Sequence, residues 1–196
     1  MTQSDTVKAL ALETLQSPAT AAERIIGYHF SRDTLWSGLV LVSAINCIIY
    51  SFSLLLTDTS LLPPFLRNPL MFFFIVTGIF VLTIHAFYWA GRAMGGHGDL
   101  GDLLKLMVWL QGLRAIAQAV LFVLMLVAPL LGNLFSLAVG ILGLWITVHF
   151  ITVALNLGSV WRGFGVMLVA GIGLVFGIVF LIGLIGLTAI GVPANV

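Results

Sequence analysis

The polar residues with the greatest capacity for chemistry stand inside long apolar segments of this sequence. They are His85, His149, Arg114 and Gln118. Such residues are costly in the hydrocarbon core of a membrane, so they commonly face the interior of a helix bundle and take part in function. With a rise of about 1.5 Å per residue, both histidines fall about 8–12 Å from the same end of their helices, and Arg114 enters from that side to a similar depth. We therefore expect these four side chains to form one intramembrane polar cluster.

Three uses of this cluster are consistent with its residue types. The histidines can form hydrogen bonds to neighbouring helices, they can relay protons or respond to pH, or they can bind a lipid or another substrate together with Arg114. A metal site needs three or four ligands, and no carboxylate or thiolate obviously completes such a set, so we expect neither a metal nor another cofactor. Hydrogen bonding between helices is the leading interpretation, and a lipid or substrate site is the alternative.

Catalysis is not expected from this sequence. An intramembrane catalytic site would need paired catalytic groups at the same depth. The acidic residues all lie outside the apolar segments, at Asp5, Glu13, Glu23, Asp33, Asp58, Asp99 and Asp102. The single cysteine, Cys47, has no second cysteine for an intramolecular disulfide. We expect a protein that is not an enzyme.

The composition identifies the class of protein. Of the 196 residues, 61% are hydrophobic and 8% are charged, whereas soluble domains carry about 25% charged residues. Too few polar side chains remain to cover a water-soluble surface, so we expect an all-α integral membrane protein. The net charge of +1 gives no basic footprint for a nucleic acid.

Five apolar segments are long enough to cross a bilayer, which takes about 20 residues of helix. They are predicted at about residues 35–56, 70–90, 110–131, 134–155 and 165–190, so that residues 35–190 form a five-helix membrane domain. Their continuous apolar character favours helices over the alternating strands of a barrel. A tight turn around Gly132–Asn133 is expected between the third and fourth helices.

The basic residues predict the orientation, because cytoplasmic loops are enriched in lysine and arginine. With a cytoplasmic N-terminus, the basic residues on the inner side are Lys8, Arg24, Arg32, Arg92, Lys105, Arg114 and Arg162. Only Arg67 falls outside, and the bias persists when Lys105 and Arg114 are left out because their helix enters the membrane. Trp89 and Trp109 are expected in the aromatic belt at the interface. We predict that the N-terminus lies in the cytoplasm and that the C-terminus lies outside.

Residues 1–34 are expected to form short helices on the cytoplasmic interface. Ser4 or Asp5 can cap the first of them, and Ser17 followed by Pro18 is a start signal for the second. A partly ordered cytoplasmic tail is the alternative.

The glycine-rich link after the second predicted span is read as a capped hinge. Gly95 and Gly96 interrupt the helix. Asp99 fits the N-cap of the next helix, with Asp102 three residues further on, where a carboxylate favours the helix dipole. These carboxylates would repel a phosphate, and the sequence has no GxxxxGK pattern. A nucleotide-binding loop is therefore not expected.

Small residues at four-residue spacing indicate close helix packing. Gly132, Ser136 and Gly140 form one such ladder, and Gly173 with Gly177 forms another. The contacts can lie within one chain or between chains.

Two stretches carry a resemblance to a known family. They are SPATAAERII, at residues 17–26, and IHAFYWAGRAMGGHGDLGDLLKLMVWLQGLRAIAQAV, at residues 84–120. With the five predicted spans, they make residues 8–185 similar to the Ypt-interacting protein (YIP) family of membrane proteins, in its bacterial branch. The resemblance implies a five-span helical protein without known catalysis, and the bacterial branch implies a location in a bacterial inner (plasma) membrane. Eukaryotic members interact with Rab-type GTPases, but this sequence lacks their long hydrophilic N-terminal domain, which argues against GTPase binding.

The expected function is therefore to organise the membrane or membrane-protein complexes. The expected partners are the lipid bilayer and either a second copy of the chain or other membrane proteins. The alternative is a small-molecule or lipid transporter that uses the histidine and arginine cluster.

Overall fold

The computed structural model describes residues 3–54 and 62–185, and this part of the chain is helical. Its helices are α1 (Gln3–Gln16), α2 (Pro18–Ile26), α3 (Arg32–Leu54), α4 (Pro64–Arg67), α5 (Pro69–Ala93), α6 (Leu100–Val127), α7 (Pro129–Ala154) and α8 (Val160–Ile185). Five of them, α3, α5, α6, α7 and α8, are long and apolar enough to cross a membrane. The predicted all-α class with five spanning helices is confirmed.

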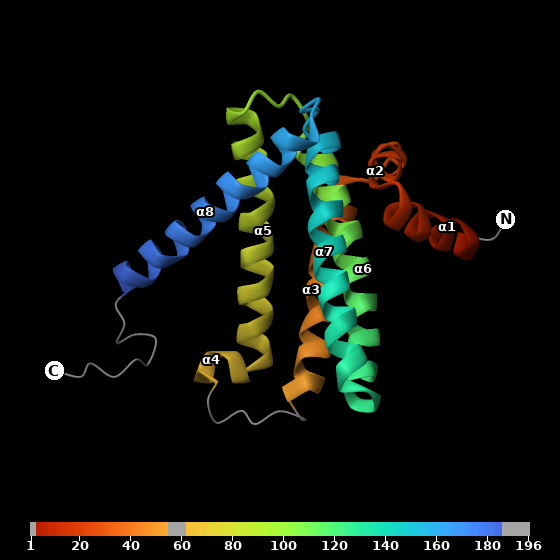
Figure 1. The fold of residues 1–196 in the computed structure, drawn as a ribbon. Coiled ribbons are helices and arrows are strands. Elements are labelled where there is room, and N and C mark those ends of the chain that lie inside the picture. The colour runs from red at the N-terminus through yellow and green to blue at the C-terminus, as the bar shows by residue number, and fades with distance from the viewer. Residues whose placement is uncertain (1–2, 55–61, 186–196) are drawn as a thin grey trace.

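Four of the long helices stand side by side as a bundle, and α8 leaves the bundle at an angle (Figure 1). Helices α6 and α7 form an antiparallel hairpin, α3 packs against α6 and α5, and α8 packs against α5 and α7. Helices α1 and α2 lie beside the bundle, where α2 contacts α6 and α7.

The two ends of the bundle differ in packing. One end holds the links at residues 94–99 and 155–159, and we call it the packed end. Leu103, Phe150 and Leu155 are fully buried there. The opposite end, which we call the open end, holds α4 and the turn between α6 and α7 (Figure 1). Val127 and Leu130 at that turn are exposed by 79% and 74%, so the core of the bundle is concentrated at the packed end.

The turn between α6 and α7 lies earlier than the sequence predicts. Helix α6 ends at Val127, and α7 begins at Pro129. Proline suits the first turn of a helix because it needs no N–H donor there, but its ring would clash with the preceding turn if α6 continued through it. Gly132 and Asn133 therefore lie inside α7, and the prediction of a tight turn at these residues is wrong.

The N-terminal segment forms two helices that are attached to the bundle. Helix α2 buries Ala21, Ala22 and Ile25, and the indole Nε1 of Trp109 on α6 donates to Thr14 Oγ1 on α1 over 3.0 Å. Trp109, one of the two predicted belt residues, is thus partly buried and tied to α1. Trp89, the other predicted belt residue, is 67% exposed.

The starts of these two helices follow the sequence signals in part. Helix α2 begins after Ser17 with Pro18 in its first turn, as predicted, although the Ser17 side chain makes no capping hydrogen bond. Helix α1 already includes Gln3. Ser4 and Asp5 therefore lie inside its first turn, and the prediction that one of them precedes the helix as a cap is wrong.

Candidate binding cavity beside Arg114

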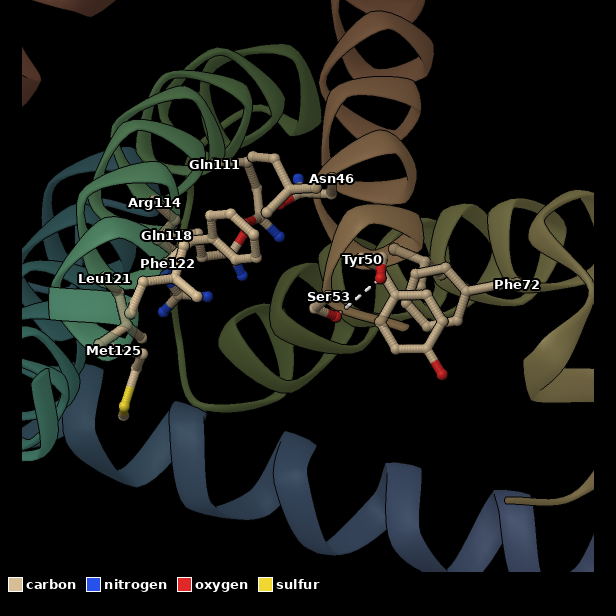
Figure 2. Close-up of a pocket in the computed structure, with 13 residues that line it drawn as sticks. Asn46, Tyr50, Ser53, Phe72, Gln111, Arg114, Gln118, Leu121, Phe122 and Met125 are labelled. Carbon is tan, nitrogen blue, oxygen red and sulfur yellow. Dashed lines mark hydrogen bonds between the residues drawn. The ribbon is translucent and has the colours of Figure 1, made fainter. Parts of the chain in front are cut away.

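A cavity of about 750 Å³ lies between α3, α5 and α6, and we call it the Arg114 cavity. Helix α6 contributes Gln111, Arg114 and Gln118, which share one helix face because they are spaced by three and four residues. Asn46 and Tyr50 line the cavity from α3. Figure 2 shows the side chains of α6 on one side of the cavity and those of α3 and α5 on the other.

Much of the hydrogen-bonding capacity of the polar wall is unused within the chain. Asn46 Nδ2 donates to Val42 O over 2.9 Å in its own helix. In the part of the chain that the structure describes, the amide groups of Gln111 and Gln118 have no hydrogen-bond partner. Each of these amides offers both donors and an acceptor to a ligand.

Arg114 is a partly buried cation near the middle of α6. Its Nη2 donates to Thr147 Oγ1 on α7 over 3.5 Å, and Thr147 Oγ1 in turn donates to Gly143 O over 2.6 Å. A Cβ atom at Gly143 would lie 3.6 Å from Arg114 Nη2. The guanidinium thus lies against α7 at Gly143, at a distance that is ordinary van der Waals contact for a Cβ atom there.

No carboxylate within residues 3–54 and 62–185 pairs with Arg114. An arginine at the centre of a spanning helix costs about 2.5–3.5 kcal/mol on insertion scales. One long hydrogen bond to Thr147 offsets only part of this, since a hydrogen bond to a charged group contributes about 1.5–3 kcal/mol at good geometry. The Arg114 cavity therefore contains a positive charge that no negative group of the described chain balances.

Apart from Ser53, whose hydroxyl donates to Tyr50 O over 2.7 Å, the remaining wall of the cavity is apolar. It is formed by Leu121, Phe122, Met125, Leu126, Ile49, Phe72 and Val76. The rings of Tyr50 and Phe72 are stacked, with centroids 3.7 Å apart and an angle of 11° between their planes. The Tyr50 hydroxyl donates to Leu66 O over 3.2 Å. The stacking joins α3 to α5 beside the cavity, toward the open end, and the hydrogen bond joins α3 to α4.

A second cavity, of about 710 Å³, lies on the other side of Arg114, between α6 and α7. Arg114 and Gln118 line this cavity as well as the first. Ser136 and Gly140 of α7 belong to its wall. The two cavities share Arg114, Gln118 and Leu121, so two of the three shared residues belong to the predicted polar cluster.

The two histidines of the predicted cluster line neither cavity. His85 Nδ1 lies 2.8 Å from Val81 O, and His149 Nδ1 lies 2.8 Å from Trp145 O. Both partners are carbonyl groups one turn earlier in the same helix. The histidines thus bond within their own helices, and the interhelical hydrogen bond of this region is made by Arg114. Within the described ranges, no three His, Cys, Asp or Glu side chains gather as metal ligands would.

The glycine-rich link is packed against the C-terminal end of α7. His97 N and Gly98 N donate to Leu155 O over 3.0 and 3.3 Å. Gly95 has φ of +86°, a conformation that glycine adopts at little cost. A Cβ at Gly96 would lie 2.9 Å from Leu155 O, and one at Gly98 would overlap Ala154 O. The link between α5 and α6 is therefore packed against the start of the link between α7 and α8, and its role is structural.

The predicted cap of α6 is present. Asp99 is the N-cap residue, and its Oδ2 accepts from Gly101 N over 3.2 Å. Asp102 Oδ1 lies 2.9 Å from Lys105 Nζ, and Lys105 also donates to Ile26 O at the end of α2 over 3.1 Å. The cap region thus also attaches α2 to α6.

The small residues of the predicted packing ladders have different surroundings. A Cβ at Gly132 would lie 3.0 Å from Met125 Sδ, so this glycine permits close contact between α6 and α7. Cβ atoms at Gly140, Gly173 and Gly177 would have no neighbour within 4 Å. In the described part of the chain, Gly173 and Gly177 therefore do not mediate helix packing.

The Yip1 domain family model matches residues 12–189 of the chain. The comparison with curated proteins finds no match, and neither does the comparison with solved structures.

Proposed function

Because this chain belongs to the Yip1 domain family, we propose that this multi-pass membrane protein organises the bilayer around it and is not an enzyme. The observation that carries this proposal is the placement of α1 and α2. They lie together at one side of the bundle, near the packed end (Figure 1), and we call them the α1–α2 unit. Val7, Leu12 and Leu15 on α1 are exposed. Apolar side chains that face outward beside a spanning bundle insert at the membrane interface.

The α1–α2 unit is rigidly attached, so its insertion would be coupled to the bundle. Arg24 Nη1 lies 3.0 Å from Glu13 Oε2 and links the two short helices. The hydrogen bond and the negative charge of Glu13 raise the pKa of Arg24, so the guanidinium stays charged in this pair. The bonds from Trp109 and Lys105 connect the unit to α6. Helices that insert into only one leaflet expand that leaflet relative to the other. Such an expansion favours membrane curvature.

The charge distribution supports a cytoplasmic packed end. Arg24, Arg32, Arg92 and Arg162 lie in or beside the elements at that end, whereas Arg67 ends α4 at the open end. Lysine and arginine are enriched on the cytoplasmic side of membrane proteins. We place α1, α2 and the N-terminus in the cytoplasm and the C-terminus outside, in a bacterial inner membrane. Lipid is then the primary partner, and other membrane proteins or a second copy of the chain are further partners.

Reconstitution tests the proposal directly. Purified protein is incorporated into vesicles, and vesicle diameters are measured by electron cryomicroscopy. We expect the wild type to narrow the vesicles and the double variant Leu12→Ser/Leu15→Ser to leave them wide. Gln16→Ser, which changes an exposed polar residue of the same helix, should behave as wild type. Equal diameters for the wild type and the double variant, at equal protein content, would contradict the proposal.

A second function, transport of a small molecule or lipid, is favoured by the Arg114 cavity. The cavity offers a positive charge, free amide groups and an apolar wall inside the spanning bundle. The residues to test are Arg114 and Gln118, since His85 and His149 line neither cavity. Flux of an anionic lipid in vesicles should fall in Arg114→Gln and persist in His85→Ala. Equal flux in the wild type and Arg114→Gln would exclude this function.

A further inference from the structure

The Arg114 cavity combines a charged half and an apolar half in one continuous space. Along α6, the face that carries Gln111, Arg114 and Gln118 continues into Leu121 and Met125 toward the open end. Eleven residues separate Arg114 from Met125, which is about 16 Å of helix. This length is about half of a 30 Å hydrocarbon core, and half of the core is the depth that one leaflet's acyl chains occupy.

The charged half is suited to an oxyanion. A guanidinium presents a planar set of N–H donors that matches carboxylate and phosphate oxygens. One of these donors is directed to Thr147, and the amides of Gln111 and Gln118 stand on the same helix face without partners in the described part of the chain. Together they can surround an anionic headgroup with hydrogen-bond donors. A cationic ligand would be repelled by Arg114.

The apolar half excludes a small inorganic anion as the full occupant. Phe72, Val76, Leu121 and Phe122 would remain without a partner if only phosphate or chloride were bound. A hydrocarbon chain attached to the anion fills this half. Met125 and Leu126 are exposed by 38% and 58%, so the apolar half is open to the surrounding lipid and the chain can enter sideways.

We propose that the Arg114 cavity binds one anionic amphiphile, with its carboxylate or phosphate headgroup on Arg114 and its acyl chain along Leu121, Phe122 and Met125. The headgroup lies nearer the packed end, and the acyl chain runs from Arg114 toward the open end. The source of the amphiphile is an acidic phospholipid or a free fatty acid. This inference specifies the ligand of the second function proposed above. It requires binding but not flux, and it is independent of the curvature produced by α1 and α2.

Native mass spectrometry of the full chain in neutral detergent tests the proposal. The probes are dioleoylphosphatidylglycerol, oleate and inorganic phosphate, each titrated separately. We expect one phosphatidylglycerol or one oleate per chain and no measurable binding of inorganic phosphate. Tighter binding of phosphatidylglycerol identifies a phospholipid as the source, and tighter binding of oleate identifies a fatty acid. Failure of both amphiphiles to bind, or equal binding of inorganic phosphate, would overturn the proposal.

Matched variants locate the site. Arg114→Gln removes the charge and keeps a hydrogen-bonding side chain, and it should weaken amphiphile binding about ten- to a hundredfold. Arg162→Gln removes an exposed cation at the start of α8, outside both cavities, and should bind as wild type does. Unchanged affinity in Arg114→Gln, or equal losses in the two variants, would refute the site.

A second variant tests the apolar half of the cavity independently of the charge. Leu121→Trp fills part of the apolar half and leaves the charge in place. Helical content measured by circular dichroism identifies the variants that are folded. We expect Leu121→Trp to reduce amphiphile binding at least tenfold, and full binding by this variant would show that the acyl chain lies elsewhere. A variant that loses amphiphile binding but still narrows vesicles as the wild type does would show that this site and the membrane-organising function are independent.

Discussion

Replacement of Gly98 by alanine should destabilise the packed end more than any ordinary surface change. The added Cβ would overlap Ala154 O, and it would lie 2.5 Å from Leu155 Cα and 2.7 Å from the Ala154 carbonyl carbon. All three atoms belong to the backbone, so no side-chain rotation relieves the overlap. Overpacking of this kind costs about 1–3 kcal/mol. Separation of the link from α7 also weakens two hydrogen bonds to Leu155 O, each of which contributes about 0.5–1.5 kcal/mol.

The sum predicts a loss of about 2–6 kcal/mol in the free energy of unfolding. The measurement is reversible unfolding in mixed micelles, followed by circular dichroism and tryptophan fluorescence. Gly78→Ala is the matched control, because a Cβ at this exposed position of α5 meets nothing within 4 Å. It should raise stability by at most about 1 kcal/mol, because alanine is a better helix former than glycine in a helix interior. A Gly98→Ala protein as stable as Gly78→Ala would refute the packing that we derive for the two links.

Three further predictions address other parts of the fold. Trp109→Phe removes the hydrogen bond to Thr14 and should make α1 more accessible to protease, at a cost of about 1 kcal/mol; wild-type cleavage rates would contradict this attachment. Gly173→Ile with Gly177→Ile should leave the monomer fold intact, because no neighbour lies within 4 Å, but it should disturb any oligomer that packs through α8; unchanged oligomer size in detergent and in lipid would exclude α8 as the contact. Arg114→Gln should raise stability in zwitterionic lipid by about 1–3 kcal/mol, since it removes an unpaired charge from the bundle; a less stable variant under these conditions would show that the arginine is already compensated.

The spanning helices could be predicted from the sequence because long apolar runs specify them without reference to tertiary contacts. The turn at Ala128 was harder to place, because both Pro129 and the Gly132–Asn133 pair are turn signals. The structure shows that Pro129 begins α7, while Gly132 stays helical and receives Met125 from the facing helix. A glycine that ends a helix and a glycine that permits close packing look alike in a sequence.

The sequence could predict the depth of each site residue in the membrane, but not the direction in which its side chain points. Depth follows from counting residues, and Arg114 and Gln118 indeed share a site. The direction in which each side chain leaves its helix depends on how the helices are rotated in the bundle, which apolar runs do not reveal. His85 and His149 therefore entered the predicted cluster, although each bonds within its own helix.

The residues that complete the cavity from α3 and α5 were missed. Asn46 is an amide inside an apolar run, and the same argument that selected Arg114 applies to it. Tyr50 and Phe72 had no such signal, because aromatic residues are common in membrane helices. Their stacking across α3 and α5 depends on a pairing of helices that only the structure establishes.

The depth of α1 in the membrane tests the central claim most directly. A spin label is attached at Leu12→Cys in a Cys47→Ser background, and its accessibility to oxygen and to a water-soluble nickel complex is measured in vesicles. The account predicts that the label at position 12 favours oxygen and is shielded from nickel, whereas a label at the exposed Glu23 of α2 is open to nickel. Equal nickel accessibility at the two positions would place α1 in water and contradict a membrane-organising role for the N-terminal helices.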